Sequence, residues 1–283
     1  MILIPVTLIV FISQLNFKRN EQRRILKSLI VKRVRTLKIK TMEKTLVQER
    51  PIFSMNFDFR SREQQEILNS LQKERYKLVG YMGASGTNQV ASGVPTWFVI
   101  DYTSVFGVLK INYEQIYKVY VYRRSDITVN TKIIMEVLSD VVTLGSEATF
   151  NPDGTFPTTS GAPGVITVKN NRPGDSSPIT VGLAAYMNGI FFPFCAFTCA
   201  AQETVSIIPD EKIALFASQT NATPGSMAGQ AHEFGCTFRF SDQNMIYDLQ
   251  MIQTTFGIKN IPGTFPVEQV SPAVSLVPLL NDF

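Results

Sequence analysis

The sequence predicts a mostly β protein, an antiparallel β-sandwich with one N-terminal helix packed on it. Short strand-like segments recur, separated by turn residues about every 8–12 positions, which is typical of sandwiches and barrels. An Asn-Gly pair joins two apolar segments, as in a hairpin. Apolar residues make up 45% of the 283 residues and aromatic residues 11%, enough for a substantial core. A jelly roll is compatible with the same pattern.

Strands are expected where β-branched and aromatic residues cluster between turn residues. In residues 116–122, Tyr117, Val119 and Val121 share one face of the strand, and Lys118 and two further tyrosines share the other. Segment 190–198 is continuously apolar, which indicates a central strand, whereas Pro193 is typical of an edge or a bulge. The expected strands cover residues 96–102, 106–112, 116–122, 132–138, 141–144, 164–169, 179–186, 190–198, 203–208, 212–219, 236–240 and 245–253.

Two connections carry specific turn chemistry. Asn188-Gly189 predicts a type I′ hairpin between two apolar strands, because both positions need positive φ. Asn151-Pro152-Asp153-Gly154 predicts a tight turn whose glycine takes positive φ.

One helix is expected over residues 62–75. Ser61 and Gln64 have the spacing of a capping box, in which the serine caps the first turn. The following apolar residues recur near helical spacing: Ile67, Leu68, Leu71 and Tyr76. The helix is expected to cover one face or one end of the strand domain.

The glycine-rich segment 80–95 is predicted to be a loop, because it combines four glycines with two serines and a proline. Its glycines Gly80, Gly83 and Gly86 do not have the spacing of a dinucleotide fingerprint, and no lysine followed by serine or threonine closes it as a P-loop. A phosphate-binding role is therefore not expected.

These patterns divide the chain into four parts. Residues 1–41 are a basic and apolar extension, and residues 42–88 hold the helix and the glycine-rich lead-in. Residues 89–253 form the β-sandwich domain. Residues 254–283 are a proline-rich, apolar C-terminal tail.

Positive charge is concentrated in one short segment. Ten basic residues and one acid between Lys18 and Lys40 give this segment +9, although the whole chain has only +4. The chain from residue 41 onward therefore carries −5. A nucleic-acid partner is not expected, because the strand domain itself is acidic.

The extension has three interpretations, one of which is a targeting or partner-binding segment. Residues 1–17 are apolar, and the next segment is a basic amphipathic helix of the kind that binds anionic membranes. Membrane contacts are then expected at Arg23, Arg24, Lys27, Arg33, Phe191 and Phe192. Alternatively, the working protein begins near Met42 and lacks this extension. The protein is expected to be membrane-associated if residues 1–41 are present and soluble if the chain starts near Met42.

Few residues suit catalysis or metal binding. The chain has three cysteines (Cys195, Cys199 and Cys236) and one histidine, His232, so neither a metal site nor a catalytic residue is predicted, and no cofactor is expected. Ser85 is not a nucleophile elbow, because Thr87 stands where that motif needs a glycine, two residues after the serine. A catalytic carboxylate pair, as in a glycosidase, stays open, because spacing in the sequence does not show which acids face each other. The candidate acids lie in or beside expected strands: Asp101, Glu136, Asp140, Asp210 and Glu211.

Aromatic residues provide the most suggestive binding feature. If Tyr120, Tyr122 and Lys118 face solvent, they form with Trp97 a platform on which a sugar ring or a lipid headgroup can stack. The opposing interpretation is aromatic pairing between strands inside the sandwich.

The protein is expected to be a non-enzymatic β-sandwich that binds a ligand or assembles with copies of itself. A saccharide is the first ligand class to test. The tail supports self-assembly if its apolar residues dock on a neighbouring subunit instead of their own domain. Two alternatives remain open, a membrane-active, pore-forming-like protein and a hydrolase with a carboxylate pair.

Overall fold

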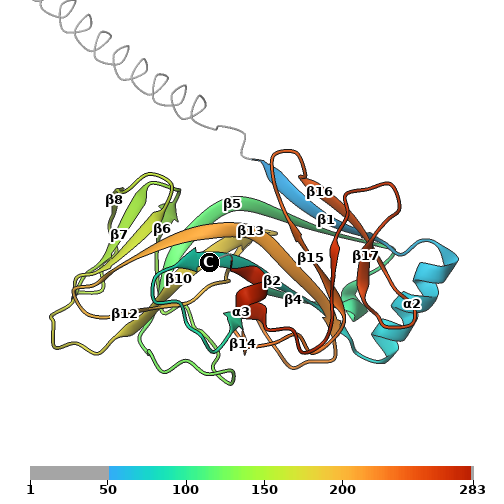
Figure 1. The fold of residues 1–283 in the computed structure, drawn as a ribbon, viewed down its shortest axis with the longest axis horizontal. Coiled ribbons are helices and arrows are strands. Elements are labelled where there is room, and N and C mark those ends of the chain that lie inside the picture. The colour runs from blue at the N-terminus through green and yellow to red at the C-terminus, as the bar shows by residue number, and fades with distance from the viewer. Residues whose placement is uncertain (1–50, 282–283) are drawn as a thin grey trace, which may run out of the picture. The chain divides into compact units, whose positions relative to one another are not determined.

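Two eight-stranded sheets pack against each other in the computed structural model of this protein, which describes residues 51–281 (Figure 1). Most neighbouring strands are antiparallel, and helices are few. The predicted mostly β sandwich with a helix packed on it is confirmed. No helix within residues 51–281 has the length and the apolar character that a membrane crossing requires.

The first sheet, sheet A, has the order β11-β10-β5-β1-β16-β17, with β12 also paired to β10 and β6 also paired to β5. Its only parallel neighbours in the described chain are β1 and β16. The bounds are β1 Ile52–Asp58, β5 Val108–Tyr122, β6 Val137–Val142, β10 Ile179–Met187, β11 Ile190–Pro193, β12 Phe197–Cys199, β16 Ile246–Met251 and β17 Ile258–Asn260.

The second sheet, sheet B, has the order β18-β15-β13-β9-β7-β8, and β2 pairs with both β13 and β4. Its bounds are β2 Lys77–Gly86, β4 Phe98–Asp101, β7 Ser146–Phe150, β8 Thr158–Ser160, β9 Ile166–Asn170, β13 Thr204–Ser218, β15 Gly235–Arg239 and β18 Glu268–Val270. A separate two-stranded ribbon joins β3 (Val94–Pro95) to β14 (Met227–Ala228).

Each sheet is organised by one strand of 15 residues, β5 in sheet A and β13 in sheet B, and both run across much of the molecule (Figure 1). Each was expected as two separate strands. The register of β5 against β10 shifts in mid-strand, and that of β13 against β2 shifts between Asp210 and Ile213. A bulge inserts residues that break the alternation, so one bent strand resembles two in the sequence.

The two sheets enclose one large aromatic core. Trp97, Tyr102 and Tyr113 are fully buried in it, and the rings of Trp97 and Tyr113 meet edge to face at 5.2 Å between centroids. Such contacts favour one arrangement of the two sheets, because edge-to-face pairs depend on geometry as well as on buried area.

The prediction of a loop over residues 80–95 is wrong for its first half, which is part of β2. The glycines are needed there because neighbours lie very close. A side chain at Gly80 would overlap the ring of Phe98, and one at Gly83 would overlap the backbone carbonyl of Leu280. Glycine in a strand marks such close approaches as well as turns.

Helix α2 (Arg62–Lys73) confirms the expected helix, and it lies at one end of the sandwich (Figure 1). The Ser61 hydroxyl accepts a hydrogen bond from the backbone N–H of Gln64 at 3.2 Å. The Gln64 side chain instead forms two hydrogen bonds with the backbone of Met251, each 3.0 Å long. It therefore ties the helix to β16.

The Asn188-Gly189 hairpin is confirmed, since φ is +47° at Asn188 and +92° at Gly189 and the turn joins β10 to β11. The segment after it is not one central strand. It forms β11 and β12, which both pair with β10 and are separated after Pro193. The tight turn before Gly154 is also confirmed, with φ +84° and a 3.0 Å hydrogen bond to the Asn151 carbonyl.

The C-terminal tail packs on its own domain. It contributes β17 and β18, and it ends in helix α3 (Leu276–Leu280), which lies over the outer face of sheet B (Figure 1). Leu276 and Leu280 are fully buried there, and the Asn281 side chain accepts a hydrogen bond from the Ala84 N–H at 3.0 Å. The expectation that this tail docks on a neighbouring subunit therefore loses its basis.

Gly182 in β10 provides a test of this packing. A methyl group at Gly182 would meet the Cys195 carbonyl and the Tyr120 ring, whose nearest atoms lie 2.7 Å away. We expect Gly182→Ala to lower the free energy of unfolding by about 1–3 kcal/mol, measured by urea denaturation.

Gly174→Ala is the matched control, because nothing lies within 4 Å of its added methyl group. Equal effects of the two substitutions would contradict the packing described for β10.

Candidate functional site

The predicted aromatic platform is not exposed. Trp97 and Tyr120 are fully buried and Tyr122 is nearly so. The Tyr120 hydroxyl donates a 2.7 Å hydrogen bond to the Cys195 carbonyl. Lys118 is half-buried, with its ammonium 5.2 Å from the ring centroid of Phe191. The expectation that Tyr120 and Tyr122 face solvent is therefore wrong.

The alternation had placed both tyrosines correctly on the outer side of sheet A. A second apolar layer covers them there, and no pattern around the two tyrosines in the sequence indicated this layer. The residues of this layer come from segments far apart in the chain: Val90, Ile133, Ala196 and Met227.

The predicted membrane contacts divide into two groups. Arg23, Arg24, Lys27 and Arg33 lie outside the described residues. Phe191 and Phe192 are half-buried in β11 and face opposite sides of it. Phe191 packs on Tyr186, with 5.1 Å between ring centroids, and Phe192 packs on the main core. They do not form a joint exposed apolar surface.

The three thiols are buried and unbridged. Burial raises the pKa of Cys195 and of Cys199 to about 12, and it raises the pKa of Cys236 further. A thiol that stays protonated at neutral pH is a poor nucleophile. Cys236 belongs to the core between the sheets, whereas His232 lines a hollow outside sheet B, so these two side chains do not form a thiol–histidine pair.

The five candidate acids lie on separate elements, apart from the neighbours Asp210 and Glu211. Asp101 caps a short helical turn, Glu136 accepts from the Arg123 N–H, and Asp140 is exposed on β6. Asp210 forms an ion pair with Arg239. The described residues contain no cluster of three or more histidine, cysteine or acidic side chains placed to hold a metal.

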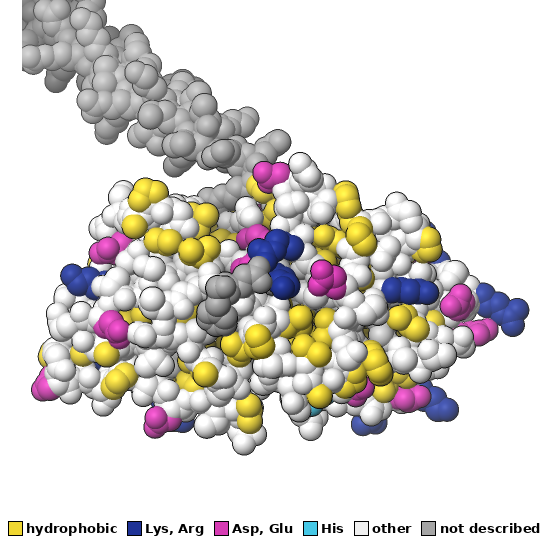
Figure 2. Space-filling view, viewed as in Figure 1, with side chains coloured by type: hydrophobic (Ala, Val, Ile, Leu, Met, Phe, Trp, Pro, Cys, Tyr) yellow, Lys and Arg dark blue, Asp and Glu magenta, His cyan; other side chains and the backbone are white. Residues whose placement is uncertain are grey.

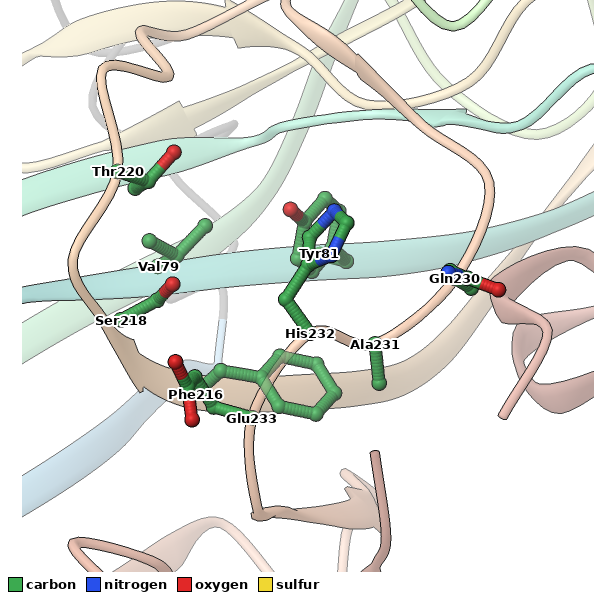
Figure 3. Close-up of a pocket in the computed structure, with 9 residues that line it drawn as sticks. All are labelled: Val79, Tyr81, Phe216, Ser218, Thr220, Gln230, Ala231, His232 and Glu233. Atoms are coloured by element: carbon green, nitrogen blue, oxygen red, sulfur yellow. The ribbon is translucent and has the colours of Figure 1, made fainter. Parts of the chain in front are cut away.

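A small hollow on the outer face of sheet B contains the single histidine (Figure 3). Tyr81 and Phe216 form its floor, and His232 and Glu233 come from the segment before β15. The enclosed space is about 20 Å³, which suits a water molecule and little more. Burial raises the pKa of Tyr81, so its hydroxyl stays protonated. This hollow is too small to take a substrate.

A polar bridge joins the two sheets where β13 bulges. The Tyr117 hydroxyl donates to Oε1 of Glu211 at 2.7 Å. The Tyr113 hydroxyl lies 2.6 Å from that of Tyr117 and 3.2 Å from the same carboxylate oxygen. Both tyrosines belong to β5, whereas Glu211 belongs to β13. The bridge therefore links the two longest strands across the core.

Burial is the main cause that raises the pKa of Glu211, and hydrogen bonds from Tyr117, Tyr113 and Gln115 act against it. Burial also raises the pKa of both tyrosines well above the ordinary value, so they remain donors. The bridge lies in the core between the two sheets, and both of its tyrosines are almost fully buried. Its arrangement suits a structural role.

An exposed apolar surface lies along β6. Its aliphatic side chains are Ile134 (56% exposed), Leu138 (39%), Val141 (44%) and Leu144 (54%), which we call the β6 surface. On the face shown in Figure 2, apolar side chains also gather over the end of the molecule that carries β6, β7 and β8.

Sequence reasoning assigned these residues to strands but did not single them out. A usable signal was present in 137–142, where apolar residues occupy both faces of one strand. Val137 and Val142 face the core, whereas Leu138 and Val141 face outward. A strand that is apolar on both faces has two surfaces to cover.

Comparison with protein-family models, with curated proteins and with solved structures found no match for this chain. Its function has to be inferred from its own residues.

The Glu211 bridge predicts a specific pH dependence. The pKa of Glu211 is raised in the folded protein, so the folded state binds more protons than the unfolded state above the ordinary glutamate pKa of about 4.3. Stability should therefore fall as the pH rises from there through the raised pKa. Over this pH range, the free energy of unfolding of the wild type should fall relative to that of Glu211→Gln. The expected fall is about 1.4 kcal/mol for each pH unit by which folding raises the pKa of Glu211.

Urea denaturation at a series of pH values measures this difference. Glu268→Gln on β18 is the control, because Glu268 is exposed. If the wild type and Glu211→Gln have parallel profiles, Glu211 is not buried in the way described.

Proposed function

We propose that this chain is a non-enzymatic, self-assembling β-sandwich protein whose copies associate through the β6 surface. The observation that carries the proposal is the exposure of Ile134, Leu138, Val141 and Leu144 within eleven positions of the chain. Exposed apolar groups that cluster with a polar rim are typical of protein interaction sites. Glu136 and Asp140 are exposed between them and supply such a rim.

The position of β6 in the sheet explains why this surface is free. β6 pairs with β5, and no other strand in residues 51–281 pairs with it, so one of its edges is open. A register shift occurs opposite Val119, whose N–H donates to the Ser139 hydroxyl at 2.9 Å instead of to a ladder carbonyl. Bulges and charged residues oppose strand addition. Association therefore occurs through packed side chains and not through an extended sheet.

A second copy of the chain fits this surface best because of charge. The segment from Lys18 to Lys40 carries +9 and the chain from residue 41 onward carries −5. The basic segment of one copy therefore attracts the acidic remainder of another, against the repulsion between two chains that each have a net charge of +4. Such attraction raises the rate of encounter and falls with ionic strength. Apolar packing at the β6 surface then supplies the short-range stabilisation, at about 25 cal/mol for each Å² buried.

Substitution of the β6 surface tests this proposal. We expect Leu138→Lys/Leu144→Lys to shift the full-length protein from oligomer to monomer, with the association constant weakened at least tenfold, because two desolvated charges would stand in the apolar centre of the interface. Light scattering coupled to size-exclusion chromatography measures the mass.

Ile208→Lys is the control, since Ile208 is 44% exposed on β13, away from β6. A wild type that is monomeric at every concentration tested would refute the proposal. So would an oligomer that Leu138→Lys/Leu144→Lys leaves intact.

A further inference from the structure

An open polar hollow lies on the outer face of sheet A, where β5, β1 and β16 run side by side. Its volume is about 290 Å³, near the lower end of the range of about 300–1,000 Å³ for small-molecule sites. The register places Lys110, Asn56 and Asp248 in one row across the three strands. Asp58 and Arg60 border this row at the end of β1, and Val108 and Ile261 supply apolar walls.

The polar groups of this hollow are held in fixed positions. The Asn56 amide donates to Oδ1 of Asp248 at 2.9 Å. Arg60 donates to both carboxylate oxygens of Asp58, with the shorter contact at 2.6 Å. The hydrogen bonds from Arg60 lower the pKa of Asp58 to about 2, so this carboxylate remains an acceptor at physiological pH.

One acceptor in the hollow lacks a partner. The side-chain oxygen of Asn56 is buried and has no hydrogen-bond partner among the described residues. A buried polar atom without a partner costs about 1–3 kcal/mol. This oxygen has almost no accessible surface, so the groups that a bound molecule can reach are the other polar atoms of the lining.

The charges limit the chemistry of the ligand. Two carboxylates, Asp58 and Asp248, alternate with two cations, Arg60 and Lys110, so the lining has no net charge. A strongly charged ligand would meet a like charge on either side. A neutral ligand whose adjacent hydroxyls both donate and accept matches this alternation, since carboxylates and amide oxygens accept while lysine and arginine donate.

We propose that this hollow binds a neutral saccharide. Hydroxyls of the sugar donate to Asp248, and they accept from Lys110. The site is separate from the β6 surface, and it is also separate from the buried tyrosines first expected to bind a sugar.

An exposed ring stands near this hollow. Phe106 is 82% exposed, and it precedes Val108 of the lining by two residues. The loop that bears Phe106 is held in place, because the Gly107 carbonyl accepts a 2.6 Å hydrogen bond from the Phe59 N–H. An aromatic ring beside fixed polar groups can stack on the apolar face of a sugar.

A printed glycan array probed with the full-length protein gives the first test. We expect retention of neutral glycans over sialylated or sulfated ones. Titration calorimetry with the best soluble glycan from the array should then show at least a tenfold loss of affinity in Asp248→Ala and in Lys110→Ala, and a smaller loss in Phe106→Ala.

Lys259→Ala is the matched control, because Lys259 is exposed on β17 opposite Gln250 and outside the lining. Thermal denaturation checks that each variant remains folded. The proposal is overturned if no neutral glycan is retained, or if folded Asp248→Ala and Lys110→Ala bind as the wild type does. Binding that Lys259→Ala also abolishes would equally place the ligand elsewhere.

Discussion

The fold depends on two long bulged strands that one carboxyl group joins. β5 and β13 each have 15 residues, and both are paired over most of their length except at the bulges. β10 pairs with the second half of β5, and β2 pairs with most of β13. Glu211 at the bulge of β13 meets Tyr117 and Tyr113 of β5. Because these side chains come from opposite sheets, their hydrogen bonds fix the relative position of the sheets as well as their separation.

The same strands determine which surfaces remain available. β1 pairs with the first half of β5 and β6 with the second half, so the outer edge of β6 is left without a paired strand in the described chain. Helix α3 covers the middle of the outer face of sheet B. The apolar layer around Tyr120 and Tyr122 covers part of the outer face of sheet A. The β6 surface and the polar face of β1, β5 and β16 remain accessible. Both proposals concern these two surfaces, which differ in chemistry, one being aliphatic and the other balanced in charge.

Local signals in the sequence predicted local structure well. The Ser61 cap, the Asn188-Gly189 turn and the alternation around Val119 each depend on nearby residues, and all three are present as expected. Predictions that depended on distant residues were wrong. Tyr120 and Tyr122 are outward on their strand, yet Ile133 and Met227 cover them. Gly80 and Gly83 indicated a loop by composition, whereas Phe98 and Leu280 require glycine in a strand. The polar hollow joins residues 56, 110 and 248, and only the register of the sheet brings these positions together.

Hydrogen exchange of the full-length protein at increasing concentration tests the proposed self-association most directly. Amides of an exposed strand exchange quickly, and an interface that packs on the side chains of the strand slows their exchange, because it excludes water and opposes local opening. The proposal predicts that amides in residues 134–144 become protected as the concentration rises, while those of the exposed segment around Asp175 do not change. If light scattering shows that the mass increases but residues 134–144 exchange at the same rate throughout, the copies associate through another surface and the role proposed for β6 is wrong.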